Sequence, residues 1–307
     1  MILVTGATGK TARRVALGLH EQGHAVRALS RDAARARHAL GTGVEIVEGE
    51  WDDGTLDRAM AGVDRVFLAV GTAPDQDLLE KQVIDAASRS GSRPHIVKLS
   101  TYGAERPADS LPPYQVAAWH RAAEAHLAAS GLPSTVLRPN AYMDNLLASA
   151  GSVAEQDTLY SSTGDGRVSM VDTRDVADVA LAVLTGDGHV GKGYQVTGGQ
   201  AVGFPMIATT LSEVLGRTIA LVPVDEATVE GALAGMGVPE PLVPVFIEGN
   251  RLIAGSPGGL RRPPRRGLQP WAAVATAQPG RRSGATTSTR SSSPRKSSGF
   301  SVHTRAA

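Results

Sequence analysis

The sequence predicts an α/β fold, a doubly wound parallel sheet with a small C-terminal lobe and a disordered basic tail. Short apolar segments alternate with amphipathic ones from residue 1 to about 140. This alternation indicates parallel strands joined by helical crossovers that cover both faces of a sheet. A glycine-rich turn joins the first strand to the first helix, and the composition changes abruptly near residue 249.

Six strands are expected before residue 140, because each is a short apolar run that ends at glycine or at polar residues. They span 1–5, 24–29, 44–48, 65–70, 95–100 and 134–138. The segments between them carry apolar residues at helical spacing and predict helices over 9–22, 32–39, 54–61, 75–90 and 114–130. Gly131 and Pro133 give a sharp stop between the last of these helices and the sixth strand.

After residue 140 the pattern is looser. It predicts a helix over 172–185, a strand over 193–197, a helix over 204–216, a strand over 218–224 and helical structure interrupted by Gly and Pro over 225–248. The chain therefore divides into three parts. They are a core over 1–140 with returning elements at about 168–198, a small lobe made of 141–167 and 199–248, and a low-complexity basic tail over 249–307.

The formal net charge of +1 hides a difference between the body of the chain and this tail. Eleven of the 31 Lys and Arg residues and none of the 30 Asp and Glu residues lie at or after residue 249, which leaves a formal charge of −10 before it. The tail has too little apolar surface to offset chain entropy, so disorder is expected. A tail that binds nucleic acid is one interpretation, and a shift of the coding frame near residue 250 is another.

Composition also disfavours several classes of site. The sequence has no Cys, which excludes disulfides, a thiol nucleophile and a cysteine-ligated metal. No cluster of His, Asp and Glu has the spacing of metal ligands, so no metal is expected. No apolar run approaches the ~20 residues of a transmembrane helix. The chain begins directly with a strand, and we therefore expect a cytoplasmic protein without membrane contact.

The turn after the first strand has small residues at a spacing of three, namely Gly6, Gly9 and Ala12. Gly6 lets the backbone turn, Gly9 lets it approach a pyrophosphate, and Ala12 lets the helix pack on the strand. The first helical turn offers unpaired N–H groups to the phosphates. Residues 1–140 are therefore predicted to be an NAD(P)-binding Rossmann core, whose phosphate loop consists of Thr5, Gly6, Ala7, Thr8, Gly9, Lys10 and Thr11.

The turn has two alternative interpretations. The run from Gly9 to Thr11 imitates the end of the phosphate loop of nucleoside triphosphatases. That loop needs a glycine five residues before Gly9, where Val4 stands. A turn that serves packing alone is the second alternative.

The end of the second strand favours NADP over NAD. In this fold the residue at that position meets the adenosine ribose, where an acid accepts from the 2′-hydroxyl and Arg favours a 2′-phosphate. Arg31 stands there, with a solvated surface Arg as the alternative interpretation. Asp32 follows immediately, so use of NAD stays open.

Five segments resemble a single known family. They are 4–9, 97–104, 130–145, 174–180 and 194–198, in the right order over roughly residues 1–225. Together they resemble the NmrA-like, atypical short-chain dehydrogenase/reductase family, especially its quinone-oxidoreductase-like branch. The resemblance implies a Rossmann domain and a small C-terminal lobe, with the cofactor in the cleft between them. Some members reduce quinones or related carbonyl compounds with NADPH, whereas others bind the cofactor as redox-sensing regulators.

One motif of short-chain dehydrogenases is absent. These enzymes usually polarise their substrate with Tyr-x-x-x-Lys, in which the Lys lowers the pKa of the Tyr. Tyr114 is followed four residues later by Ala118, and no other Tyr of the region has the Lys partner. Hydride donation by the cofactor itself, with the protein orienting the acceptor, is the mechanism that remains, and it suits a quinone.

The carboxyl ends of the strands supply cofactor-binding candidates, because open α/β sheets place their ligands there. Ala69, Val70 and Gly71 end the fourth strand with small side chains that leave space for the ribose and pyrophosphate. Ser100 ends the fifth strand, and Lys98 of the same strand either touches ribose hydroxyls or lies at the surface.

Asp52 follows the third strand, where the resemblance places an acidic residue near the adenine. A helix N-cap is the alternative for Asp52. The resemblance also suggests that His120 faces the cofactor, at a position where some relatives carry Lys. There the imidazole hydrogen-bonds the nicotinamide ribose or supplies a proton, and a surface His is the alternative.

Residues Asn140, Ala141, Tyr142 and Met143 leave the sixth strand, and in relatives this segment lies along the nicotinamide. A Tyr142 ring stacked on a flat acceptor is expected there. His120 and Tyr142 are the catalytic candidates.

Two contacts near the cleft are also expected. His120 and Glu124 lie four residues apart on one helix, so they are expected to be neighbours. Arg138 is expected to pair with an acid such as Asp175 and to join the two lobes.

The sequence therefore predicts an enzyme, an NADPH-dependent oxidoreductase that transfers hydride to a quinone or similar electron-poor carbonyl acceptor. The alternative is a non-catalytic NADP-binding regulator that senses redox state and acts through a protein partner. The expected cofactor is NADP, with NAD left open. The expected partner is a quinone-like small molecule, a homodimer is left open, and nucleic acid enters only through the basic tail.

Overall fold

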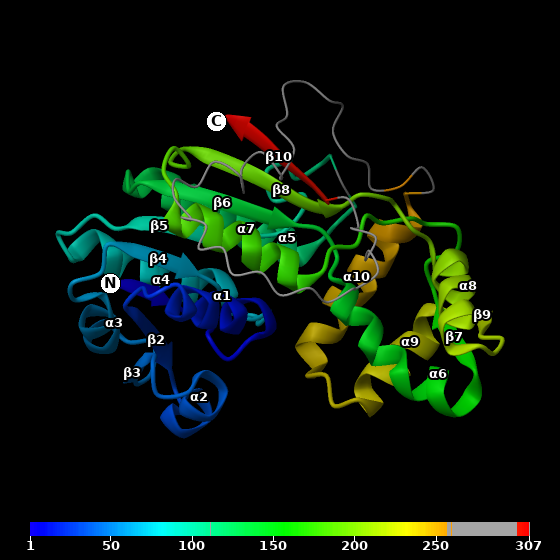
Figure 1. Cartoon of the computed structure of the whole chain (residues 1–307). Coiled ribbons are helices and arrows are strands. Elements are labelled where there is room, and N and C mark those ends of the chain that lie inside the picture. Colours follow the sequence, from blue (N-terminus) through cyan, green and yellow to red (C-terminus); the bar gives the residue numbers. More distant parts are fainter. Residues whose placement is uncertain (111, 257–258, 260–299, 307) are drawn as a thin grey trace, which may run out of the picture.

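The computed structural model describes residues 1–110, 112–256, 259 and 300–306. Its larger part is an eight-stranded sheet with the strand order β10-β8-β6-β5-β4-β1-β2-β3 (Figure 1). Seven strands are parallel: β1 Ile2–Val4, β2 Val26–Ser30, β3 Glu45–Glu48, β4 Arg65–Leu68, β5 His95–Leu99, β6 Ser134–Pro139 and β8 Lys192–Gly198. β1 lies between β2 and β4, so the direction of winding reverses there, and open α/β sheets bind ligands outside the carboxyl edge at such a point.

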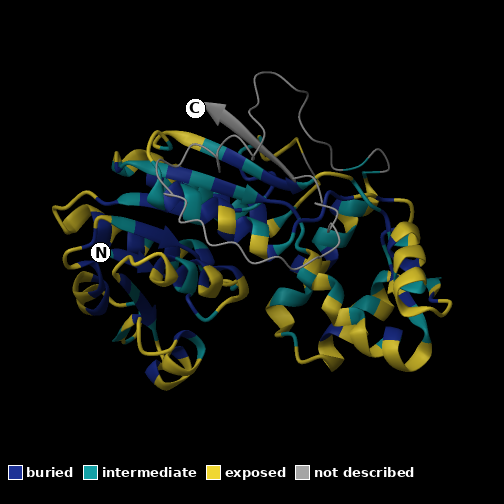
Figure 2. Cartoon of the chain, viewed as in Figure 1, coloured by how far each residue is buried: buried dark blue, intermediate teal, exposed yellow. Residues whose placement is uncertain are grey.

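Helices cover both faces of this sheet. They are α1 Lys10–Glu21, α2 Ala33–Leu40, α3 Asp53–Met60, α4 Gln76–Arg89, α5 Gln115–Ser130 and α7 Thr173–Thr185. Successive residues of β1 point to opposite faces: Ile2 and Val4 join a core with α1 and α7, whereas Leu3 joins a core with α3, α4 and α5. Figure 2 shows the central strands in dark blue and the outer faces of the helices in yellow. Such two-sided burial explains why these strands are almost wholly apolar.

The small lobe has its own apolar core. Its elements are the 3-10 helix η1 Met143–Ser149, α6 Ala150–Gln156, β7 Thr158–Ser161, α8 Phe204–Leu215, β9 Ala220–Pro223, α9 Glu226–Gly235, the 3-10 helix η2 Glu240–Leu242 and α10 Val243–Ala254. β7 and β9 form a separate parallel pair. Leu159 of β7, Ile207 of α8 and Leu252 of α10 pack together, and Tyr102 after β5 joins them from the core domain. The lobe is therefore anchored on the carboxyl side of the sheet.

The predicted fold class is confirmed, since the expected strands and helices of the first 140 residues all form, with ends that shift by a few residues. Between residues 141 and 167, where the sequence analysis gives no elements, the structure has η1, α6 and β7. Short elements of this kind carry too few residues for a hydrophobic period to be seen.

The structure differs from the predicted tail at two places. α10 continues to Ala254, so the boundary at residue 249 falls inside a helix whose apolar face packs on the small lobe. The strand β10 Phe300–Ala306 pairs antiparallel with β8 at the edge of the sheet. The expectation of disorder for 260–299, and with it a nucleic-acid-binding tail, lies outside the described residues. Within the described ranges, no helix combines the length and the apolar character that crossing a membrane requires.

Candidate functional site

The glycine turn lies at the carboxyl edge of the sheet, where β1 meets β4. Gly6 has a φ of +60°, and a Cβ atom placed on it would lie 2.7 Å from the carbonyl oxygen of Ala69. The hydroxyl of Thr5 donates to this carbonyl at 2.8 Å and accepts from the Ala69 N–H at 2.9 Å. Ala7 and Thr8 complete the turn. The chain thus turns where only glycine fits, and Thr5 fastens the turn to the neighbouring strand.

The start of α1 leaves room for an anion. Gly9, its N-cap residue, has an ordinary extended backbone, and a Cβ placed on it would meet only the Gly6 carbonyl oxygen, at 3.1 Å. No side chain of the described residues caps this helix. Lys10 is exposed and Thr11 is buried in the first helical turn. The N–H groups of this turn and the positive end of the helix dipole are therefore available to a phosphate.

Two neighbouring side chains after β2 have different contacts. Asp32 accepts from the backbone N–H of Arg35 at 2.9 Å and so caps α2. Arg31 is exposed, and it forms no ion pair within the part of the chain that the structure describes. The cation is thus available to a 2′-phosphate, while one oxygen of the Asp32 carboxylate is engaged by the helix.

Asp52 caps α3. Its carboxylate accepts from the Thr55 N–H at 2.8 Å, and this hydrogen bond lowers the pKa of Asp52. The helix cap is therefore the observed role of Asp52, and a contact with adenine stays a prediction. After β4, Ala69 is buried and Val70 is half-buried, whereas no atom lies within 4 Å of a Cβ placed on Gly71. The space beside Gly71 is therefore empty of other atoms of the described residues.

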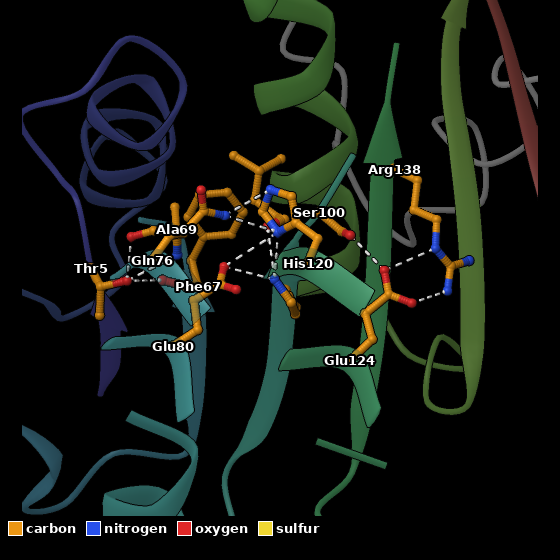
Figure 3. Close-up of polar contacts among 11 residues, drawn as sticks. Thr5, Phe67, Ala69, Gln76, Glu80, Ser100, His120, Glu124 and Arg138 are labelled. Atoms are coloured by element: carbon orange, nitrogen blue, oxygen red, sulfur yellow. Dashed lines mark hydrogen bonds and ion pairs between the residues drawn. The ribbon is translucent and has the colours of Figure 1, made fainter. Parts of the chain in front are cut away.

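A buried cluster of polar side chains lies beside these strand ends (Figure 3). Lys98 of β5 and Glu80 of α4 are both fully buried, with Lys98 Nζ 2.7 Å from Glu80 Oε1. Nδ1 of His120, on α5, lies 3.0 Å from Lys98 Nζ and 3.6 Å from Glu80 Oε1. Gln76, one turn before Glu80, has its amide nitrogen 2.9 Å from His120 Nε2. We call these four residues the lysine cluster.

Burial and mutual charge set the protonation of the lysine cluster. Burial lowers the pKa of His120, and the Lys98 charge lowers it further, so the imidazole is neutral near neutral pH. Burial tends to raise the pKa of Glu80, but the charge of Lys98 and contacts with His120 outweigh it, and the net shift is downward. Burial lowers the pKa of Lys98, and Glu80 opposes that shift. The net pKa shifts of Glu80, His120 and Lys98 are all downward, which favours a carboxylate at Glu80 and a neutral imidazole at His120, while the Glu80 carboxylate at 2.7 Å favours the charged form of Lys98.

The contact with Lys98 favours one tautomer of His120. The charged form of Lys98 can only donate, and with it Nδ1 of His120 accepts from Lys98 while Nε2 carries the proton. The Gln76 amide nitrogen lies 2.9 Å from Nε2 and 3.2 Å from Nδ1 of His120, so it is nearly equidistant from the two ring nitrogens and is not in line with the Nε2–H bond. Gln76 Oε1 is buried without a hydrogen-bond partner among the described residues.

A second polar network joins β5, β6 and α5. The Ser100 hydroxyl donates to Glu124 Oε1 at 2.5 Å. Arg138 of β6 binds the same carboxylate through Nε at 3.0 Å and through Nη2 at 2.5 Å, and Glu105 Oε2 lies 3.7 Å from Arg138. Figure 3 shows this network next to the lysine cluster. Because the Ser100 proton is engaged by Glu124, the Ser100 oxygen is left to accept a hydrogen bond from a ligand.

These contacts correct several expectations. The surface alternatives for Lys98 and His120 are wrong, since both side chains are buried. His120 and Glu124 share a helix face but hydrogen-bond different partners. The partner of Arg138 is Glu124 and not Asp175, because α5 and α7 pack on opposite faces of the sheet. Asp175 instead has an oxygen that is buried without a partner in the described part of the chain.

The segment after β6 reaches the same edge of the sheet. Asn140 is buried; its Oδ1 accepts from the Ala141 N–H at 2.9 Å, and its Nδ2 has no partner among the described residues. Tyr142 packs against the core that contains α1 and lies beside Thr11, and burial raises the pKa of its phenol. Met143 is 45% exposed. A buried amide donor, a phenol and a thioether thus follow one another beside the glycine turn.

Gln76 and Glu80 are the members of the site that the sequence analysis missed. Neither belongs to a recognised motif, but a signal for them exists. They are four residues apart and lie on the helix face that also carries Val83, Ile84 and Ala87. Two polar residues on an otherwise apolar helix face indicate a buried partner, and Lys98 is the one available on the adjacent strand.

The edge of the sheet fits a dinucleotide. Among the described residues, it combines a helix start beside Gly9 without a side-chain cap, an Arg31 cation without an ion pair and an Asn140 amide nitrogen without a partner. No group of three His, Asp or Glu residues suited to a metal ion is found within the described ranges.

Comparisons with known proteins agree with this geometry. A family model described as NAD(P)H-binding matches residues 6–187. The chain is 36% identical to the NAD(P)H azoreductase of Xenophilus azovorans, over 81% of this chain and 85% of that protein. It is 30% identical to quinone oxidoreductase 2 of Escherichia coli, over 85% of this chain and 90% of that protein.

Solved structures share the fold. An NADPH-dependent quinone oxidoreductase of Escherichia coli, crystallised with NADPH, matches with a TM-score of 0.74 and 27% identity, over 84% of this chain and 90% of that one. The triphenylmethane reductase of Citrobacter sp., complexed with NADP(H), matches with a TM-score of 0.73 and 27% identity, over 83% and 90% of the two chains. The predicted NAD(P)H cofactor is thereby confirmed, and the relatives support an oxidoreductase. The chain belongs to the NAD(P)H-binding family, within the atypical short-chain dehydrogenases/reductases.

Proposed function

We propose that this protein is an NADPH-dependent reductase that transfers hydride to a quinone or similar electron-poor acceptor, with His120 as the proton donor. The observation that carries the proposal is the imidazole of His120, buried at the carboxyl side of the sheet with Lys98 Nζ 3.0 Å from its Nδ1. The chain lacks the Tyr-x-x-x-Lys pair. His120 and Lys98 offer an alternative source of the proton that carbonyl reduction needs.

The glycine turn and its surroundings hold the cofactor in this proposal. The N–H groups of the first turn of α1 bind the pyrophosphate next to Gly9. The Arg31 guanidinium binds the 2′-phosphate and so favours NADPH over NADH. The Asn140 amide, whose nitrogen has no partner within the described part of the chain, donates to the ligand, and the Ser100 oxygen accepts from it.

Bound NADPH supplies the hydride. Converting a quinone into a hydroquinone with one hydride requires one further proton, and His120 holds one at Nε2. Tyr142 keeps its phenol proton at neutral pH because burial raises its pKa, so it offers a flat uncharged ring to the acceptor. Met143, exposed beside it, adds a polarizable apolar contact.

The relatives support this acceptor class. Their names refer to azo compounds, quinones and triphenylmethane compounds, which are conjugated molecules that accept electrons readily. A site that orients a flat acceptor beside the cofactor serves all three.

The test combines binding with turnover. NADPH affinity is measured by titration, and NADPH oxidation is followed with a panel of quinones and azo dyes. We expect binding together with turnover of at least one quinone, and a His120→Gln variant that binds NADPH but reduces the quinone ~10²-fold or more slowly. Tight NADPH binding without turnover of any acceptor would contradict the enzyme and favour the redox-sensing regulator.

A further inference from the structure

The lysine cluster contains more charge than packing requires. Lys98 and Glu80 are completely removed from water, and apolar side chains of similar size would fill this space without any cost of desolvation. Glu80 Oε2 is buried without a hydrogen-bond partner among the described residues, so the ion pair is not fully satisfied. Its charge is therefore better explained by a role in the reaction than by stability.

The geometry aligns three groups along a path for a proton. Lys98 Nζ lies 3.0 Å from His120 Nδ1, and the imidazole ring connects Nδ1 to Nε2. An imidazole can take up a proton at one nitrogen while it releases another from the opposite nitrogen. Glu80 Oε1 lies 2.7 Å from Lys98 Nζ and 3.6 Å from His120 Nδ1, so it fixes the ammonium at the ring.

On the basis of the proposed function, we propose that Lys98 is the proton reservoir of the reductase, refilling His120 through Nδ1 as Nε2 gives its proton to the acceptor. Lys98 and Glu80 act through His120 and are positioning residues. Glu80 holds the ammonium in place and balances its charge.

The proton steps balance. The Nε2–H bond of His120 breaks as an O–H bond forms on the acceptor, whose second hydrogen and both electrons arrive as hydride. An N–H bond of Lys98 breaks as an N–H bond forms at Nδ1, which leaves His120 neutral in the other tautomer and Lys98 uncharged. After product release, Nε2 takes a proton from water and Nδ1 returns its own to Lys98, which restores the starting state.

The charges around the cluster are compatible with this transfer. Besides Glu80 on α4, the groups that act on His120 and Lys98 are Glu124 on α5 and Arg138 on β6. Glu124 and Arg138 pair with each other, so their effects on Lys98 largely cancel. Burial lowers the pKa of Lys98, which eases release of its proton.

The first experiment determines the tautomer of His120 and needs no turnover. The protein is labelled with ¹⁵N-histidine, and the His120 signals are assigned by comparison with His120→Gln. We expect a neutral ring protonated at Nε2 from about pH 6 to about pH 8, both with and without NADP. An imidazolium at about pH 7, or a ring protonated at Nδ1, would overturn the proposal.

The second experiment compares two acceptors. A quinone needs hydride and a proton, whereas a cationic triarylmethane dye becomes neutral by accepting hydride alone. Lys98→Arg keeps a positive charge next to Glu80 but does not release its proton. We expect its kcat to fall at least ten times more with the quinone than with the dye. Equal losses with the two acceptors would show a purely structural role and would overturn the proposal.

Two further variants keep this test decisive. Arg is larger than Lys, so the double variant Glu80→Gln/Lys98→Met removes both charges at similar volume, and it is expected to show the same selective loss with the quinone. Lys81→Met is the matched control, because Lys81 is a half-buried Lys of the same helix that pairs with Asp77 outside the lysine cluster. Absence of all turnover in the wild type would refute the proposed reductase, while the ¹⁵N measurement would still decide the state of His120.

Discussion

Lys98 Nζ lies 2.7 Å from Glu80 Oε1, and neither side chain has any solvent exposure. The pair ties β5 to α4 across 18 residues of sequence. An ion pair of this kind is costly to bury and still more costly to break, since removal of one partner leaves the other charge alone in an apolar interior.

Removing one member of this pair is therefore expected to destabilise the protein strongly. Lys98→Met should lower the free energy of unfolding by about 3–5 kcal/mol, because Glu80 stays buried without its counter-charge. The double variant Glu80→Gln/Lys98→Met should cost much less than Lys98→Met alone. Urea unfolding curves measure both values. A double variant as unstable as the single one would mean that packing, not charge, accounts for the loss.

Arg31 is expected to select NADPH. Arg31→Ala should weaken NADPH binding by ~1–3 kcal/mol through loss of a charge-assisted contact, with little effect on NADH, which has no 2′-phosphate. Titrations with both cofactors measure the difference. Arg37→Ala, an exposed Arg on α2, is the control. Equal weakening of the two cofactors by Arg31→Ala would show that this residue does not contact the 2′-phosphate.

Gly9 and Gly6 should respond differently to a side chain. Gly9 has a backbone conformation that any residue adopts, so Gly9→Val should remove NADPH binding by filling the phosphate space while thermal unfolding changes little. Gly6→Ala places a Cβ 2.7 Å from the Ala69 carbonyl oxygen at a positive φ, and it should lower the unfolding temperature. Unchanged affinity in Gly9→Val would contradict the loop assignment.

Asp175 should make stability depend on pH. Burial, with the charges of Asp172 and Asp178, raises the pKa of Asp175 from 3.8 to about 6. The folded state therefore holds this proton more tightly than the unfolded state, and the contribution to stability falls as the pH rises from about 4 to about 6. Asp175→Asn should be more stable than the wild type at about pH 7 and lose that advantage below about pH 4.

Urea unfolding of Asp175→Asn and the wild type across this pH range measures the effect. Asp187→Asn is the control, because Asp187 is fully exposed. A stability difference that stays constant with pH would show that the Asp175 proton is not responsible.

Much of the core domain was predictable from local sequence. The apolar runs at 2–4, 66–68 and 96–97 are short and lie inside β1, β4 and β5, which is the pattern of strands buried on both faces. Gly131 ends α5 in the left-handed conformation, and that stop was visible in the sequence. In the small lobe, η1, α6 and β7 each span seven residues or fewer, and such short segments carry no readable period.

Side-chain partners were less predictable than elements. The predicted partner of Arg138 was Asp175 on α7, whereas the observed partner is Glu124 on α5, because sequence spacing does not say which helix covers which face of the sheet. The same holds for Lys98, whose position near a strand end was compatible with the surface. Its burial follows from α4 and α5 closing over β5.

The sequence by itself determined the dinucleotide turn, because Gly6, Gly9 and Ala12 act within a few residues of one another and local geometry sets their roles. It also showed that the Tyr-x-x-x-Lys pair is absent. Only the tertiary structure decided that Gln76 contacts His120 and that Glu80 pairs with Lys98, since these contacts depend on how α4 and α5 pack against β5. Lys98 is buried, and a buried charge requires an opposite charge or a hydrogen-bond partner. The local sequence around Lys98 does not show this requirement.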